Sequence, residues 1–209
     1  MMEQEHVWVS RVKLDTAAAV ARRDISDPYQ MHKTLCRAFS RRHGGTFSHE
    51  CTPFLWRLEP ATDSVIVQSC VKPCWADTGP DWMAGCDTPR DIAPVYRAIP
   101  LGATFRFRLL ANPCTGKNGK RCGIDDPTKQ TEWLIHQGGY HGFKLKSVEI
   151  VDSNVIRGRK GDGTPDVVFR YALFEGVMNV TEAKQFQNCL VHGIGKAKAF
   201  GCGLLSLAS

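Results

Sequence analysis

The clearest strand in the sequence reads Ala103-Thr-Phe-Arg-Phe-Arg-Leu-Leu-Ala-Asn112. Its side chains alternate, with Phe105, Phe107 and Leu109 on one face and Arg106 and Arg108 on the other. Such alternation is typical of a strand that buries one face of a sheet and exposes the other. The two arginines either contact a ligand or merely solvate the open face of that sheet.

The chain beyond this strand predicts a helix, two strands and a second helix. The first helix is expected to open at Pro127, to carry Trp133, Leu134 and Ile135, and to close at Gly138-Gly139. Strands are expected at 143–151 and 167–178, joined by a turn rich in Arg, Gly and Asp.

The second helix of this half is expected to be capped by Thr181. Its apolar stripe consists of Ala183, Phe186, Leu190 and Val191. A glycine-rich loop and a terminal strand follow. The second half therefore predicts the order β-α-β-β-α-β.

The first half predicts a similar unit. A strand is expected at 6–14, and Ser26-Asp27-Pro28-Tyr29 opens a helix that runs to about Arg42. Strands at 54–59 and 64–69 are separated by a Pro-Ala-Thr-Asp turn. Residues 73–100 are rich in proline and lack periodicity, which predicts an irregular connector.

Two successive units of this kind predict an α+β protein with two tandem ferredoxin-like (RRM-like) domains, each an antiparallel sheet with helices packed on one face. We place the domains at residues 1–95 and 96–209. Because ferredoxin-like folds support many unrelated activities, function has to be argued from the sites.

Composition and charge narrow the possible functions. The chain has 209 residues, 43% of them hydrophobic, which excludes disorder, and no apolar stretch approaches the length of a membrane span. The N-terminal residues lack a secretory signal, so we expect a cytoplasmic protein with no membrane contact. Residues 1–99 carry 12 Lys and Arg against 12 Asp and Glu, whereas residues 100–209 carry 15 against 9. This basic half favours a polyanion, most commonly nucleic acid.

The nine cysteines are odd in number and widely spaced, which argues against a disulfide framework. Cys70 and Cys74 have no second closely spaced pair beside them, since Cys114 and Cys122 are too far apart for a zinc knuckle. We expect no metal and no other cofactor.

The densest motif is a loop with glycines at Gly193, Gly195, Gly201 and Gly203 and lysines at Lys196 and Lys198. Such a loop can bring backbone N–H groups close to an anion, or it can be a connector that packs closely on a sheet. It is not a dinucleotide fingerprint, because it follows a helix rather than a strand, and its spacing is not that of a P-loop.

The helix after Asp27 has three distinguishable faces. At about 100° per residue, Met31, Thr34, Leu35, Ala38 and Phe39 form the core stripe, and Lys33, Arg37 and Arg41 form a basic stripe opposite. His32 and Tyr29 lie one turn apart at the boundary, where both can reach one spot. On these residues alone, His32 is either structural or catalytic.

Four stretches of the chain together closely resemble the CasE family, the CRISPR repeat-processing endoribonucleases of type I-E Cascade. One is Gly193-Ile-Gly-Lys-Ala-Lys-Ala-Phe-Gly-Cys-Gly-Leu-Leu-Ser-Leu-Ala208, preceded by Leu173-Phe-Glu-Gly176. The others are residues 27–35, residues 55–60 with 67–69, and residues 105–113. Glycine loops of this sort occur across related CRISPR processing enzymes, but the four stretches in this order are specific to CasE. The resemblance covers essentially the whole chain.

The resemblance implies a metal-independent endoribonuclease with His32 and Tyr29 as catalytic residues. RNA supplies the nucleophile, its 2′-hydroxyl, so the enzyme aligns that oxygen, moves two protons and stabilises charge. The implied products are a 2′,3′-cyclic phosphate and a 5′-hydroxyl. The family's phosphate-contacting arginine falls at Arg159, in a basic hairpin tip with Arg157 and Lys160.

Further contacts follow from the same resemblance. Lys33 and Arg37 are candidates at the scissile phosphate, and Lys196 and Lys198 are candidates for RNA binding. The implied partners are the CRISPR repeat RNA stem-loop, as precursor and as product crRNA, and other type I-E Cascade subunits, with no direct DNA contact.

The sequence alone leaves two alternatives open. One is a non-catalytic RNA-binding protein with tandem RRM-like domains, although no stretch supplies the RNP1 signature. The other is a small-molecule phosphate enzyme that uses the glycine loop.

Overall fold

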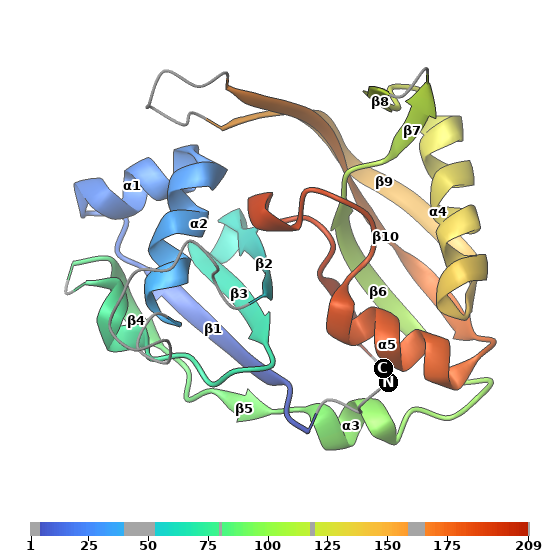
Figure 1. Ribbon diagram of the computed structural model, residues 1–209, viewed down its shortest axis with the longest axis horizontal. Helices are drawn as coiled ribbons and strands as arrows, with labels where there is room; N and C mark the ends of the chain where they lie inside the picture. Colours follow the sequence, from blue (N-terminus) through green and yellow to red (C-terminus); the bar gives the residue numbers. More distant parts are fainter. Residues whose placement is uncertain (1–4, 40–52, 80, 118–119, 159–165, 209) are drawn as a thin grey trace. The chain divides into compact units, whose positions relative to one another are not determined.

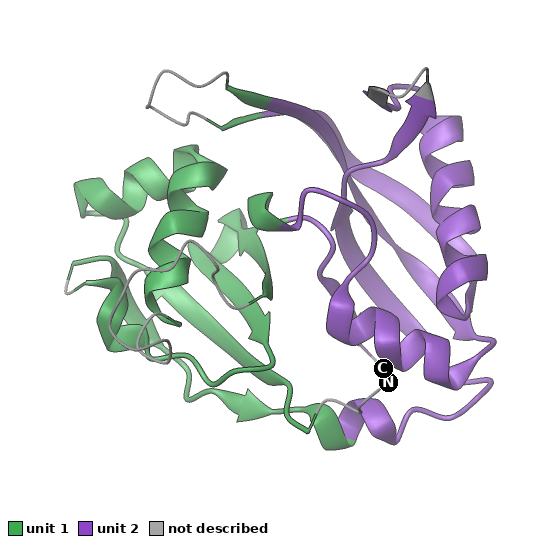
Figure 2. Ribbon diagram, in the orientation of Figure 1, with its two compact units in different colours: residues 1–94, 157–167, 199–201 green, residues 95–156, 168–198, 202–209 purple. Residues whose placement is uncertain are grey.

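The protein is described by a computed structural model that covers residues 5–39, 53–79, 81–117, 120–158 and 166–208. It divides into two compact units, one formed by residues 1–94, 157–167 and 199–201 and the other by residues 95–156, 168–198 and 202–209 (Figure 2). Two short segments of the second half of the sequence therefore belong to the first unit.

The first unit is a sheet covered by two helices (Figure 1). Its strand order is β2-β3-β1-β4, and β5 also pairs with β1. The elements along the chain are β1 (Trp8–Leu14), α1 (Ala19–Ser26), α2 (Pro28–Arg37), β2 (Phe54–Glu59), the 3₁₀ turn η2 (Pro60–Thr62), β3 (Ser64–Ser69), the 3₁₀ turn η3 (Trp75–Thr78), β4 (Met83–Cys86) and β5 (Arg90–Asp91).

The core of this unit confirms the predicted apolar face of α2. Met31 and Leu35 are fully buried and pack with Val12, Val65 and Trp56 of the sheet. Lys33 and Arg37, on the opposite face, are exposed. The helix ends at Arg37, and Arg41 and the expected end near Arg42 lie outside the described residues.

The second unit has strand order β11-β6-β10-β9, the order of a ferredoxin-like sheet whose β-α-β-β-α-β chain begins at β6. The elements of this part of the chain are α3 (Ala93–Arg97), β6 (Thr104–Ala111), β7 (Cys114–Lys117), β8 (Lys120–Gly123), α4 (Pro127–His141), β9 (Phe143–Gly158), β10 (Val167–Val180), α5 (Ala183–His192), the 3₁₀ turn η4 (Lys198–Phe200) and β11 (Leu205–Ala208). Of these, α3, β9, β10 and η4 each have one or two residues in the first unit. Phe107 and Leu109 of β6 are buried, as their alternation predicts. The predicted α+β class with antiparallel sheets is confirmed.

Three sequence predictions about elements are wrong. Residues 73–100 are not wholly irregular, because β4 and β5 pair with β1 and α3 follows them. Thr181 does not cap α5. The N-cap is Glu182, and the N–H groups of Thr181 and Glu182 both donate to the carbonyl oxygen of Gly142. Backbone hydrogen bonds therefore hold the N-terminus of α5 in place. The third error concerns the end of α4.

Helix α4 does not close at Gly138-Gly139 but continues to His141, and Gly142 takes the left-handed conformation with φ of 72°. The two inner glycines differ in their surroundings. A Cβ on Gly138 would lie 2.6 Å from the carbonyl oxygen of Phe143, whereas a Cβ on Gly139 would meet nothing within 4 Å. Gly138 is therefore required by close packing, and Gly139 is not.

This contrast predicts opposite effects of two adjacent substitutions. Gly139→Ala should raise the free energy of unfolding by about 1 kcal/mol, since alanine is the better helix former. Gly138→Ala should lower it by about 1–3 kcal/mol, because the backbone at Phe143 has to move. Urea unfolding followed by circular dichroism measures both, and a rise in both variants would contradict the packing argument.

Candidate active site

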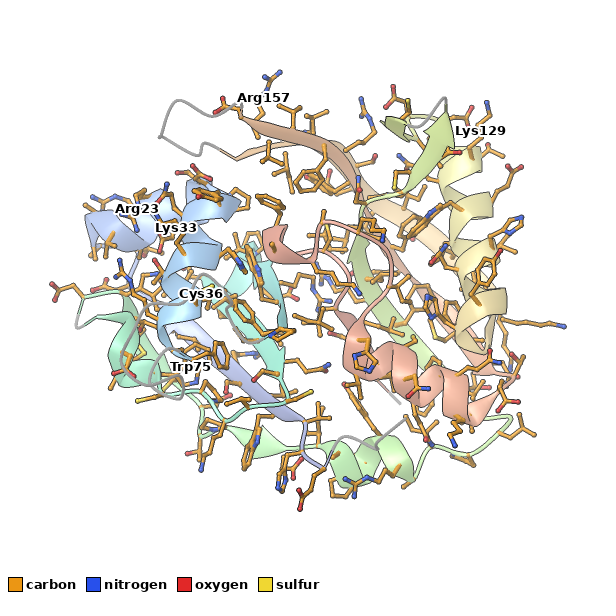
Figure 3. The ribbon with its side chains drawn as sticks, viewed as in Figure 1. Arg23, Lys33, Cys36, Trp75, Lys129 and Arg157 are labelled. Carbon is orange, nitrogen blue, oxygen red and sulfur yellow. The ribbon has the colours of Figure 1, made fainter. Side chains whose placement is uncertain are left out.

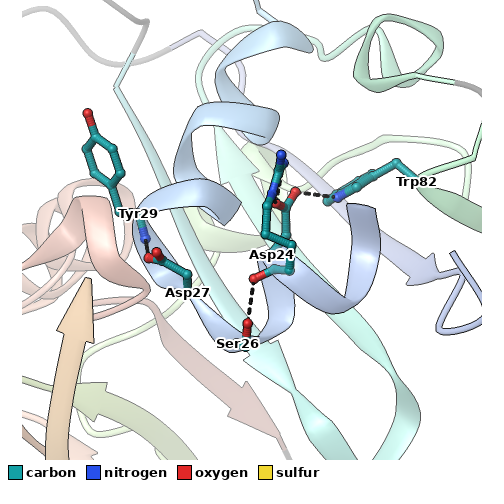
Figure 4. Close-up of polar contacts among 6 residues, drawn as sticks. Asp24, Ser26, Asp27, Tyr29 and Trp82 are labelled. Atoms are coloured by element: carbon teal, nitrogen blue, oxygen red, sulfur yellow. Dashed lines mark hydrogen bonds and ion pairs between the residues drawn. The ribbon is translucent and has the colours of Figure 1, made fainter. Parts of the chain in front are cut away.

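The start of α2 is fixed by local chemistry. Asp27 is the N-cap, and its Oδ1 accepts a hydrogen bond of 2.9 Å from the backbone N–H of Tyr29 (Figure 4). Pro28 occupies the first turn, where its missing N–H costs nothing. This cap orients the first helical turn and hence the backbone of Tyr29.

A buried carboxylate anchors the preceding helix. Asp24 of α1 is 1% exposed, and its two oxygens accept from Trp82 Nε1 at 2.8 Å and from Arg23 at 2.6 Å. Figure 4 shows the ring of Tyr29 pointing away from the contact between Asp24 and Trp82. This anchor was not predictable from the sequence, because Trp82 lies in the stretch expected to be irregular.

His32 packs into the first unit rather than standing free. Its ring stacks on Phe54 with centroids 5.1 Å apart, and its Nε2 lies 3.7 Å from Sγ of Cys36, one turn further along α2. Its Nδ1 is buried and has no hydrogen-bond partner among the described residues. Burial lowers the pKa of His32 below the usual histidine value, so the neutral imidazole is favoured in the free protein.

Tyr29 and Lys33 are neighbours on the exposed side of α2. Tyr29 is half-buried, Lys33 is exposed, and the Lys33 Nζ lies 5.7 Å from the centroid of the Tyr29 ring. Figure 3 places Lys33 and Cys36 on this helix. Together with Arg37, which is also exposed, Lys33 adds positive charge to the helix that carries His32 and Tyr29.

The end of β9 reaches the start of α2. Gly158 is buried, and a Cβ on it would lie 3.4 Å from the Tyr29 Cβ and 3.7 Å from Oδ1 of Asp27. Arg157 beside it is exposed at the end of the strand (Figure 3). Arg159 and Lys160 lie outside the described residues.

The glycine loop is closely packed. Its four glycines all have positive φ, namely Gly193 (72°), Gly195 (77°), Gly201 (87°) and Gly203 (95°). Two of its backbone N–H groups donate to other backbone groups: Ile194 donates to the Gly203 carbonyl within the loop, and Gly203 donates to the Leu110 carbonyl of β6. This geometry matches the connector that packs on a sheet, one of the two interpretations of the loop.

The two lysines of the loop differ. Lys196 is exposed, whereas Lys198 is half-buried. Burial, followed by the charge of Lys196, lowers the pKa of Lys198. Burial, followed by the charge of Lys198, likewise lowers the pKa of His141. Lys198 therefore packs within the second unit.

Arg106 and Arg108 of β6 are not equivalent either. Arg108 lies opposite Glu175 of β10 and forms an ion pair with it at 3.3 Å, whereas Arg106 lies opposite Val177 and is exposed. Arg106 is thus the more available of the two for a ligand.

The structure brings Tyr29, His32, Lys33 and Arg37 together on one helix, and it adds Gly158 beside Tyr29. Sequence reasoning missed Phe54, which supports the ring of His32, and it missed the packing of Gly158 against Tyr29. In the described part of the chain, no group of three or more His, Cys, Asp or Glu side chains could hold a metal ion. No helix among the described residues is long and apolar enough to cross a membrane.

Comparisons with known proteins bear on this site. A family model described as CRISPR associated protein matches residues 7–209. The CRISPR-associated endoribonuclease Cse3 of Thermus thermophilus is 33% identical over 97% of this chain and 100% of its own. The CRISPR system Cascade subunit CasE of Escherichia coli is 28% identical over 90% of this chain and 96% of its own. A solved structure of Thermus thermophilus Cse3, bound to an RNA that represents a pre-cleavage complex, has a TM-score of 0.85 and 31% identity, and covers 98% of this chain and 100% of that chain.

Proposed function

This chain belongs to the CRISPR associated protein family, and from that membership we propose that it is an endoribonuclease that cleaves CRISPR precursor RNA at the 3′ base of the repeat stem-loop. The resemblance to the CasE family is confirmed by the relatives of the chain. The observation that carries the activity is the arrangement on α2, where an imidazole, a phenol and an ammonium group share one helix in a chain 33% identical to a named endoribonuclease.

The chemistry requires no metal. The 2′-oxygen attacks the adjacent phosphorus, the bond from phosphorus to the 5′-oxygen breaks, and the proton lost from the 2′-hydroxyl is balanced by a proton given to the leaving oxygen. The products are a 2′,3′-cyclic phosphate and a 5′-hydroxyl.

We assign His32 as general acid to the leaving oxygen and Tyr29 to the neighbourhood of the 2′-hydroxyl. The lowered pKa of His32 in the free protein favours its neutral form. A phosphate beside the ring opposes this effect, because a nearby negative charge raises the pKa of an imidazole. RNA binding therefore favours the charged, acidic form of His32.

The RNA is held by basic groups outside the catalytic pair. Lys33 and Arg37 contact the scissile phosphate, and the hairpin tip with Arg157, Arg159 and Lys160 engages the stem through its phosphates. A-form RNA is read mostly by shape and backbone, which suits a basic hairpin. Lys196 and Lys198 of the loop with Gly193, Gly195, Gly201 and Gly203 add positive charge.

The two domains divide these tasks. Residues 1–95 supply the catalytic helix, and residues 96–209 supply the hairpin and the glycine loop. The enzyme acts in the cytoplasm and retains its crRNA. It also assembles with other type I-E Cascade subunits, and the Escherichia coli relative is named a Cascade subunit.

A second candidate function is a non-catalytic RNA-binding protein. It is favoured by the surroundings of His32. The buried Nδ1 and the stacked ring of this residue also suit a histidine with a structural rather than a catalytic role.

Purified protein incubated with repeat RNA and with a scrambled hairpin, each with and without excess chelator, separates the two candidates. We expect one cut in the repeat RNA, no cut in the scrambled hairpin, and no effect of chelator. Tight binding of the repeat without any cleavage would favour the second candidate.

A further inference from the structure

Two segments that are distant in sequence meet at the first turn of α2. A Cβ on Gly158 would lie 3.4 Å from both the Cβ of Tyr29 and the Cε1 of Phe200. All three residues belong to the first unit, which takes residues 157–167 and 199–201 from the second half of the chain (Figure 2). Phe200 therefore reaches the neighbourhood of Tyr29 from the glycine loop.

The loop holds Phe200 in place through the residue that follows it. Gly201 has φ of 87°, a conformation that favours glycine, and a Cβ there would lie 3.2 Å from the indole ring of Trp56. Trp56 is 3% exposed in the core of the first unit. The backbone after Phe200 is thus pressed against a rigid buried ring, so Phe200 has little freedom to move.

Tyr29 is constrained from three directions. Asp27 holds its backbone N–H at 2.9 Å, Lys33 lies 5.7 Å from its ring centroid, and Gly158 lies beside its Cβ with Phe200 on the other flank of that glycine. The first two contacts come from α2 and its N-cap. The packing of Gly158 between Tyr29 and Phe200 comes from outside the helix and can select a rotamer, because it limits the space around the Tyr29 Cβ.

We propose that Phe200 is a positioning residue for Tyr29, and that the absence of a side chain at Gly158 allows the two to approach. This inference rests on the proposed function and adds to it a role for the glycine loop. Phe200 does not contact the RNA. It determines the position of the Tyr29 hydroxyl relative to the 2′-hydroxyl of the RNA. Since a misplacement of about 1 Å can cost roughly a hundredfold in rate, such support has a large kinetic effect.

The same contact links RNA binding to the active site. Arg157 is adjacent to Gly158 in the chain and is exposed. A phosphate bound by Arg157 is therefore one residue away from the glycine that packs against Tyr29. This short spacing along the chain limits the distance between the bound RNA stem and the hydroxyl of Tyr29.

A graded series at Gly158 tests the steric part of the proposal. An alanine Cβ at 3.4 Å makes ordinary van der Waals contact, so Gly158→Ala should leave the single-turnover cleavage rate within about threefold of wild type. Gly158→Val adds methyl groups into the space of Tyr29 and Phe200 and should lower the rate about 10- to 100-fold. Gly85→Val, at a glycine of the same unit with nothing within 4 Å, is the matched control. Equal rates for Gly158→Val and Gly85→Val would overturn the steric argument.

A double-mutant cycle tests whether Phe200 acts through Tyr29. Phe200→Leu should lower the single-turnover rate about tenfold in the wild-type background, but less than about twofold in the Tyr29→Phe background, where there is no hydroxyl to position. The affinity for repeat RNA and the thermal unfolding midpoint should stay unchanged in both. Additive losses, or a loss explained by weaker RNA binding or lower stability, would overturn the positioning role. A wild-type protein that binds but never cleaves would instead refute the proposed function itself.

Discussion

Replacement of His32 by alanine should reduce the single-turnover rate of repeat RNA cleavage by about 10²- to 10⁴-fold, the range that a positioned general acid contributes. Only the proton transfer to the leaving oxygen is lost, because no part of the hairpin that holds the stem is changed. The affinity for repeat RNA should therefore remain within about threefold, since the basic groups that bind the other phosphates are unchanged. Gel-based cleavage and filter binding, both in excess chelator, measure the two quantities.

The matched control for this variant is His136→Ala, which removes an exposed histidine of α4. It should leave cleavage and binding unchanged. His32 also stacks on Phe54, so the unfolding midpoint of the His32 variant has to be measured to separate lost chemistry from lost structure. A folded His32→Ala protein that cleaves at the wild-type rate would remove His32 from the mechanism.

Replacement of Lys33 by glutamine should lower the cleavage rate by about a hundredfold, because the transition state carries negative charge that a positioned cation stabilises. Lys33 is exposed and lies 5.7 Å from the ring centroid of Tyr29, on the helix that carries His32. Its loss acts on the transition state more than on bound RNA. We therefore expect a large fall in the single-turnover rate with a small change in affinity.

Two further variants show whether charge is the cause. Lys33→Arg keeps the positive charge and should recover most of the rate. Lys13→Gln removes an exposed lysine from β1 of the same unit and should have little effect. If Lys33→Gln weakens RNA binding as much as it slows cleavage, Lys33 is a general RNA contact and not a transition-state group.

Elements with local determinants were predictable from sequence. Asp27 and Pro28 mark the start of α2 because capping depends only on neighbouring residues, and the side chain of Asp27 does cap the helix. The alternation in β6 likewise identifies its buried face, with Phe107 and Leu109 inside. Such signals need no knowledge of the rest of the fold.

Elements that depend on distant partners were not predictable. Gly138-Gly139 resembled a helix end because glycine usually disfavours helices, yet Gly138 is retained for its approach to Phe143. Strands β4 and β5 are short and take their stability from pairing with β1, so they leave no alternating pattern. Helix α1 is anchored by Asp24 to Trp82, far along the chain.

The candidate site likewise has features that local sequence predicts and features that depend on distant segments. The shared helix of Tyr29, His32 and Lys33 follows from helical spacing alone. The stacking of Phe54 on His32 and the packing of Gly158 between Tyr29 and Phe200 arise from contacts between segments far apart in sequence. The catalytic side chains are therefore easier to predict from sequence than the residues that pack against them and position them.

The most direct measurement replaces the nucleotide 5′ to the scissile phosphate by its 2′-deoxy form in the repeat RNA. If the RNA supplies its own nucleophile, this substitution should abolish cleavage without weakening binding. The unmodified RNA should yield an upstream fragment that ends in a 2′,3′-cyclic phosphate, with or without chelator. Cleavage of the deoxy RNA at the normal rate, or loss of all cleavage in chelator, would contradict a metal-independent attack by the 2′-hydroxyl.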